Sequence, residues 1–184
     1  MPLVRMPGMI DVHVHLREPG ATHKESFLTG TAAALAGGVV AVLDMPNNNP
    51  PITDRQTLEL KKSIASTSAL CDYGFYLGAT AGNTTTSSEL APETAGLKIY
   101  LGATYGPLLL QDLNALVAHF RNWPPTKPIA VHAEGLFVAV AIALAALYRR
   151  HVHICHVSRA EEIALIRAAK EKGIPVTCEA TPHH

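Results

Sequence analysis

The chain has 184 residues, with 15 basic and 15 acidic side chains, no formal net charge at pH 7 and 48% hydrophobic residues. That length is ample for a hydrophobic core and suggests a single domain. The balanced charge, without a cluster of Lys and Arg, argues against a nucleic-acid or anionic-membrane binder, because both need a positive field. Charged residues make up only 16%, which disfavours intrinsic disorder.

The absence of predicted targeting segments and the small number of cysteines indicate the compartment. The longest apolar run, from Leu136 to Tyr148, is shorter than the roughly 20 residues that a membrane-spanning helix needs. No basic segment followed by an apolar one opens the chain, so no secretory signal is predicted. Three cysteines then fit a reducing compartment better than a disulfide scaffold. The sequence predicts a cytoplasmic protein with neither a membrane nor a nucleic-acid partner.

Short apolar runs rich in β-branched residues alternate along the chain with longer stretches of helical spacing. The runs predict strands at Met9–Leu16, Val39–Met45, Tyr73–Ala79, Leu97–Leu101, Ile129–His132, Val152–Val157 and Val176–Ala180. The stretches between them predict helices at Lys24–Ala36, from a cap at Thr53 or Asp54 to Ala69, at Leu110–Phe120, at Leu136–Arg149 and at Ser158–Lys172, with a weak one at Gly82–Thr94. In the last strong helix, Ser158 is the expected N-cap and Gly173 the C-terminal stop.

This alternation indicates βαβ units and therefore a parallel sheet. No Gly-rich phosphate-binding pattern is present, whereas polar residues follow many of the strands, as at the active face of a (β/α)8 barrel. A complete barrel takes about 250 residues. We therefore expect an incomplete α/β TIM barrel, with residues 1–184 forming one partial domain that has about seven strands and lacks the last strand and helices.

Histidines and one lysine lie where such a barrel would gather them. His13 and His15 are two apart in the first strand, so both face the barrel interior and can chelate a metal ion, although a buried hydrogen-bonded pair explains them equally well. His132 and His156 end two later strands. Lys98 lies in an apolar strand, where a buried amine is costly unless it is paired, neutralised or modified. Carbamylation would convert it into a carboxylate that can bridge two cations; alternatively, Lys98 reaches out of the barrel mouth.

These motifs resemble those of the cyclic amidohydrolases. The segment PGMIDVHVHLREPG at 7–20 is the main match, and MPN at 45–47 and VHICHV at 152–157 strengthen it. Together with the Lys98 segment and residues 177–184, they make the chain most similar to the dihydroorotases, as a C-terminally truncated copy of the dihydroorotase domain in the multifunctional pyrimidine-synthesis polypeptide. Two pairs depart from the usual pattern: Asn48-Asn49 and Gly102-Ala103.

The resemblance implies a zinc-dependent reaction. His13 and His15 would bind one Zn²⁺, His132 and His156 a second, and carbamylated Lys98 would bridge the two. Water activated between the metals would serve the reversible cyclisation of N-carbamoyl-L-aspartate to L-dihydroorotate, a step of de novo pyrimidine (UMP) biosynthesis.

The resemblance also assigns the substrate's carboxylate. Arg17 and Asn47 would hold it, and Arg17 suits this because its guanidinium offers a planar, bidentate fork. The alternative for Arg17 is an ion pair with Glu18 or Glu25 at the rim. Family members use an aspartate at the end of the eighth strand as general acid/base. It is expected downstream, so no catalytic residue is assigned within this chain, and we expect the 184 residues alone to be inactive or nearly so.

Several residues near these positions are ambiguous. Cys155 and Glu179 are candidates for a third metal site or for supporting roles; the interpretation as a buried thiol and a rim carboxylate is the simpler one. Asp44 is a candidate for a supporting role behind the ligands. His119 is expected at the surface or at a helix end.

Partners and competing functions complete the expectations. The apolar helix at Leu136–Arg149 should be buried, either against a second subunit of a homodimer or against the missing helices. Fusion to other pyrimidine-pathway domains is expected as well. The alternatives are another cyclic amidohydrolase, namely allantoinase or dihydropyrimidinase (hydantoinase), and a non-catalytic amidohydrolase-like scaffold.

Overall fold

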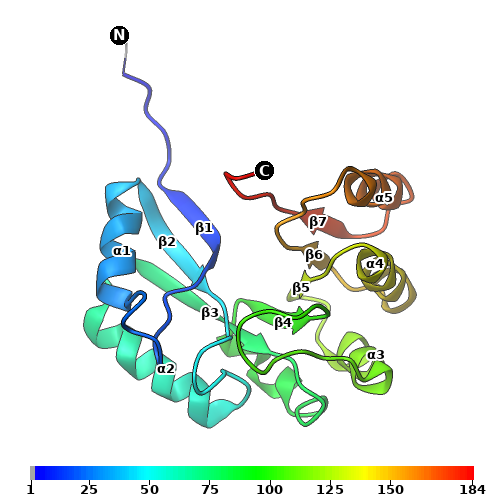
Figure 1. Cartoon of the computed structure of the whole chain (residues 1–184), viewed down its shortest axis with the longest axis horizontal. Coiled ribbons are helices and arrows are strands. Elements are labelled where there is room, and N and C mark those ends of the chain that lie inside the picture. Colours follow the sequence, from blue (N-terminus) through cyan, green and yellow to red (C-terminus); the bar gives the residue numbers. More distant parts are fainter. Residues whose placement is uncertain (1–2) are drawn as a thin grey trace.

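The computed structural model describes residues 3–184, which fold around one parallel sheet whose strands lie in sequence order. The strands are β1 (Met9–Val14), β2 (Val39–Asp44), β3 (Asp72–Gly78), β4 (Gly96–Tyr100), β5 (Ile129–His132), β6 (Val152–Ile154) and β7 (Val176–Cys178). They follow an arc with the helices along its outer side, and β1 and β7 lie at the two ends of the arc (Figure 1). This is the incomplete seven-stranded barrel that the sequence predicts.

The helices begin and end close to the predicted positions. They are α1 (Phe27–Ala36), α2 (Arg55–Ser68), α3 (Leu113–Asn122), α4 (Leu136–Tyr148) and α5 (Ala160–Glu171), and the weak helix is the 3-10 segment η1 (Ser87–Glu93). Asp54 caps α2, because its side chain accepts a hydrogen bond from the Thr57 amide. The predicted cap at Ser158 is wrong: Arg159 is the N-cap of α5, and the Glu162 carboxylate accepts the amides there.

The core lies between the sheet and the helices. All five residues of β4 are buried, as expected for a strand covered on both sides. On the helical side, Phe27, Leu58 and Phe120 are completely buried against the sheet. Side chains of this size each stabilise the fold by about 1.5–3 kcal/mol through burial, so the sheet curvature that gathers the strand ends is firmly held.

Helix α4 is only partly buried within this chain. It packs between α3 and α5 (Figure 1), yet Leu136 is 77% exposed and Leu147 71% exposed. Its burial against a second subunit or against further helices stays a prediction. Because both flanks already have a neighbouring helix, the apolar outer face of α4 is not the face that further barrel helices would cover.

Two findings bear on the compartment. Among the described residues, no helix combines the length and the apolarity needed to cross a bilayer. Cys71, Cys155 and Cys178 are all free thiols.

Candidate metal centre

Four imidazoles meet at the carboxyl ends of the strands. His13 lies in β1, His15 directly follows it, His132 ends β5 and His156 comes two residues after β6. The ring centroids are 5.3 Å apart for His13 and His15, 5.5 Å for His13 and His156, and 4.7 Å for His132 and His156. The sheet thus brings together the histidines that the sequence singled out from three separate strands.

The environment favours the neutral form of three of these imidazoles, those of His15, His132 and His156. Burial, assisted by the charge of His13, lowers the pKa of His15 to about 3. Burial and the nearby Lys98 lower the pKa of His156 to about 4 and also lower that of His132. A metal ion binds the neutral form of histidine, so the donor set suits a divalent cation such as zinc at neutral pH.

Lys98 lies next to this cluster and is completely buried. Its Nζ donates a hydrogen bond to Cys155 Sγ at 2.8 Å and lies 5.2 Å from the centre of the Tyr100 ring. Within the described part of the chain it forms no ion pair with a carboxylate. The alternative in which Lys98 reaches out of the barrel mouth is therefore wrong.

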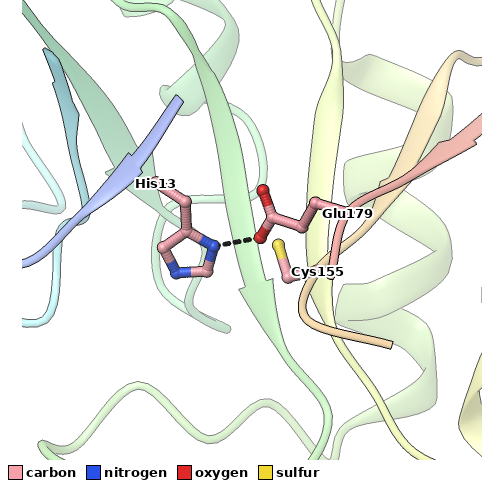
Figure 2. Close-up of side chains that lie close together, drawn as sticks. All are labelled: His13, Cys155 and Glu179. Carbon is pink, nitrogen blue, oxygen red and sulfur yellow. Dashed lines mark hydrogen bonds and ion pairs between the residues drawn. The ribbon is translucent and has the colours of Figure 1, made fainter. Parts of the chain in front are cut away.

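A second group of ligand-type atoms adjoins the first. The imidazole of His13, the thiol of Cys155 and the carboxylate of Glu179 offer atoms that all lie within 4.8 Å of one another (Figure 2). Glu179 bridges two histidines, because Oε1 meets His13 Nδ1 and Oε2 lies 3.1 Å from His153 Nε2. Burial alone would raise the pKa of Glu179, but these hydrogen bonds outweigh it and hold the pKa well below its usual range. Glu179 is thus a paired group inside the site and not a solvated rim carboxylate.

Asn47 contacts the cluster directly. Its Oδ1 accepts a hydrogen bond from His15 Nδ1 at 2.8 Å, and its Nδ2 donates to the Tyr105 carbonyl at 3.2 Å. Because an amide oxygen only accepts, the bond places the His15 proton on Nδ1 and leaves Nε2 free as a ligand atom. One N–H of the Asn47 amide remains for a substrate.

Arg17 sits beside this pair in an unusual backbone conformation, with a φ of 61°. Its Nη1 is buried and has no hydrogen-bond partner among the described residues, and the guanidinium lies 5.2 Å from the Tyr105 ring centre. The carboxylates of Glu18 and Glu25 instead accept backbone amides at the start of α1. The ion-pair alternative for Arg17 is therefore absent from the structure.

Two residues at the site, Tyr105 and His153, were not predicted from the sequence to belong to it. Tyr105 lies in a loop, and nothing in its sequence context pointed to Arg17 or Asn47. For His153 a signal existed, because residues 151, 153 and 155 share one side of an extended strand, which places His153 on the same side as Cys155.

The fold is that of a parallel-stranded barrel with a cluster of ligand-type side chains at its strand ends, and the comparisons identify the family. The Amidohydrolase family profile matches residues 4–183, so the chain belongs to that family. It is 53% identical over 182 residues to the multifunctional protein CAD of Squalus acanthias, covering 99% of this chain and 8% of that protein. It is 35% identical over 195 residues to a dihydroorotase of Pyrococcus abyssi, covering 97% of this chain and 45% of the other.

A solved structure extends the comparison. The inactive dihydroorotase-like domain of the Chaetomium thermophilum CAD-like multifunctional protein is 28% identical, with a TM-score of 0.81, over 95% of this chain and 52% of that one. The chain thus spans about half the length, or less, of the proteins it matches. The expected family and barrel fold are confirmed.

Proposed function

We propose that this chain is part of a zinc-dependent dihydroorotase, which interconverts N-carbamoyl-L-aspartate and L-dihydroorotate in de novo pyrimidine synthesis. The observation that carries the proposal is the convergence of four imidazoles, three of them with lowered pKa values, and a buried lysine, together with an unpartnered guanidinium nitrogen among the described residues. Similarity to a dihydroorotase and to a multifunctional CAD protein supports this substrate class. Residues 1–184 would form one partial domain, in the cytoplasm.

For the metals, we assign His13 and His15 to one Zn²⁺, His132 and His156 to a second, and carbamylated Lys98 to the position between them. Bound divalent cations would supply Lewis-acid activation of water and of the carbonyl under attack. The surroundings of Lys98 support the modification, since a buried ammonium without a carboxylate partner is costly and a carbamate would instead be an anion among imidazoles.

A third cation is a further part of the proposal. His13, Cys155 and Glu179 together offer nitrogen, sulfur and oxygen, the donor types that zinc accepts. Cys155 is buried, and burial raises the pKa of its thiol, so a metal there would have to displace a proton. Occupancy of this site should therefore rise with pH.

Arg17 and Asn47 would bind the α-carboxylate of the substrate. The buried Nη1 of Arg17 lacks a partner, and a carboxylate oxygen would satisfy it. The remaining N–H of Asn47 would add a second donor while its oxygen keeps His15 in the metal-binding tautomer. These side chains would select a charged substrate over the uncharged rings of a dihydropyrimidinase or hydantoinase.

Two ligands that differ by one carboxylate test this assignment. N-carbamoyl-L-aspartate and N-carbamoyl-β-alanine should be compared by calorimetry with zinc-loaded protein. We expect at least tenfold tighter binding of the aspartate derivative, and loss of that preference in Arg17→Ala. Equal affinity for both ligands would favour the dihydropyrimidinase alternative, and stronger binding of allantoate than of either would favour allantoinase.

The remaining alternative is a non-catalytic scaffold. The similarity to an inactive dihydroorotase-like domain gives this alternative a concrete example. This chain retains ligand-type side chains at all five proposed metal positions. Metal analysis separates the two ideas: about two zinc ions per chain, or three if the third site is filled, are expected for an enzyme, and none for a scaffold.

For partners, we propose a homodimer through α4 and fusion to other pyrimidine-pathway domains. One side of α4 carries no charged residue; Leu136, Ala143 and Leu147 are exposed there and Val140 is half-buried. A two-fold contact would pair this face with itself. Leu147→Glu should yield a monomer by light scattering, whereas Leu113→Glu, at an exposed site on α3, should not.

A further inference from the structure

A buried ammonium lies beneath the two loops that follow β1 and β2. Lys61 projects from α2, and its side chain is completely buried. Its Nζ lies 2.8 Å from Asp44 Oδ2, 2.8 Å from the Met45 carbonyl and 2.7 Å from Asn48 Oδ1. The contacts to Met45 and Asn48 are hydrogen bonds and the contact to Asp44 is an ion pair, so the charge of the amine is paired without any contact to the histidine cluster.

Two of these partners reach across to the loop after β1. Asp44 Oδ1 accepts a hydrogen bond from the Leu16 amide at 2.9 Å. Asn48 Nδ2 donates a hydrogen bond to the Glu18 carbonyl at 2.9 Å. The two bonds therefore end on the residues immediately before and immediately after Arg17.

Arg17 needs such support. Its φ of 61° lies in the left-handed region, which residues other than glycine rarely adopt unless surrounding contacts enforce it. The same conformation accompanies the burial of Nη1 without a partner. A clamp on both neighbouring residues would hold this backbone and so fix where the guanidinium points.

We propose that Lys61 is a positioning residue for the anion-binding site: through Asp44 and Asn48 it clamps the backbone on both sides of Arg17. The identity of the anion, a substrate carboxylate, rests on the proposed function; the clamp itself does not. Lys61 touches no ligand, so its loss should weaken carboxylate recognition while the histidines still bind metal.

The test compares three variants with the wild type. Lys61→Met removes the ammonium with little change in length, and Asn48→Ala removes the bonds of Asn48 to Glu18 and to Lys61 while leaving the pair between Lys61 and Asp44. Lys62→Met is the matched control, because Lys62 is the next residue of the same helix but pairs with Glu59 and Glu93 at the surface. Each variant is measured for amide hydrogen exchange in residues 15–20, zinc content, and affinity for N-carbamoyl-L-aspartate and N-carbamoyl-β-alanine.

We expect exchange in residues 15–20 to accelerate at least tenfold in Lys61→Met, less in Asn48→Ala and not at all in Lys62→Met. Affinity for N-carbamoyl-L-aspartate should fall at least tenfold in Lys61→Met, with affinity for N-carbamoyl-β-alanine and zinc content kept. Unchanged exchange, or an equal loss of both ligands, would overturn the clamp. If Lys61→Met does not fold, Asn48→Ala decides by the same criteria.

The measurements also separate this inference from the proposed function. If the wild type shows no preference for N-carbamoyl-L-aspartate, the dihydroorotase assignment fails. Hydrogen exchange then still decides the clamp, since faster exchange in Lys61→Met supports it and unchanged exchange overturns it.

Discussion

The two lysines buried in this fold, Lys61 and Lys98, have contrasting surroundings. Lys61 lies between α2 and the sheet and meets a carboxylate and two further oxygen acceptors. Lys98 lies beside the histidine cluster and meets a thiol and the face of the Tyr100 ring. A buried ammonium persists when its donors and its charge are both satisfied, and is costly otherwise.

This contrast assigns the two amines to different tasks. The charge of Lys61 is already paired within the protein, and its contacts link the loops that follow β1 and β2. Lys98 would gain from becoming an anion, because three imidazoles proposed as metal ligands lie close enough for its positive charge to lower their pKa values. Burial alone therefore does not mark a lysine as functional; the missing counter-charge does.

The largest effect should follow from removing the proposed bridging group. Lys98→Ala is expected to lose at least half of the bound zinc and, in the whole enzyme, to lower turnover about 10³-fold or more, since a shared ligand of both metals disappears. Zinc is measured by mass spectrometry, and added acetate or propionate should restore part of it by replacing the carboxylate. Full zinc content in Lys98→Ala would contradict the bridging role, and Lys62→Ala is the control.

The same substitution at both lysines should give different stabilities in metal-free protein. Lys61→Met is expected to destabilise the fold by about 3–5 kcal/mol, because Asp44 is left as an uncompensated buried charge. Lys98→Met should change stability by only about 1 kcal/mol in either direction, since it removes no ion pair. Urea unfolding in the presence of a chelator measures both, and equal losses at the two sites would remove the basis of the comparison.

The sequence predicted the layout of the site better than its supporting contacts. Period-2 and period-3.6 patterns located all seven strands and the main helices, and parallel strand ends gather the histidines at one edge regardless of loop detail. Lys61 was overlooked, although its spacing from Leu58 and Ala65 places it on the buried face of α2. A polar residue on an apolar face was a usable signal.

Other features could not be predicted from local patterns. His119, expected at the surface or at a helix end, lies in the last turn of α3 but is completely buried and bonds the Thr80 carbonyl, a partner 39 positions away. The approach of Tyr105 to Arg17 depends on how a loop without regular structure folds back. Such long-range side-chain contacts are fixed by tertiary packing, which single-sequence periodicity does not encode.

Acid should weaken the region around Lys98 before that around Lys61. The pKa values of His15 and His156 are lowered to about 3 and about 4, against about 6.5 in the unfolded chain. Below pH 6.5 the unfolded state therefore binds more protons, and unfolding free energy should fall by up to about 1.4 kcal/mol per pH unit for each such histidine until about pH 4. Above pH 7 this contribution is flat. Urea titrations of metal-free protein test it, and His15→Asn should lower the slope; stability that does not fall toward pH 4.5 would contradict it.

The smallest effect is expected from the thiol that partners Lys98. In Cys155→Ser the hydroxyl still accepts a hydrogen bond, so metal-free stability should change by about 1 kcal/mol or less. If His13, Cys155 and Glu179 bind a third cation, the same variant should lose that ion while keeping the other two, because a serine hydroxyl is a poor zinc ligand. Zinc titration at pH 8 measures this. If Cys155→Ser keeps every ion, Cys155 has only a packing role. Lys98 would then have no partner that metal binding requires, and its surroundings would differ even more from those of Lys61.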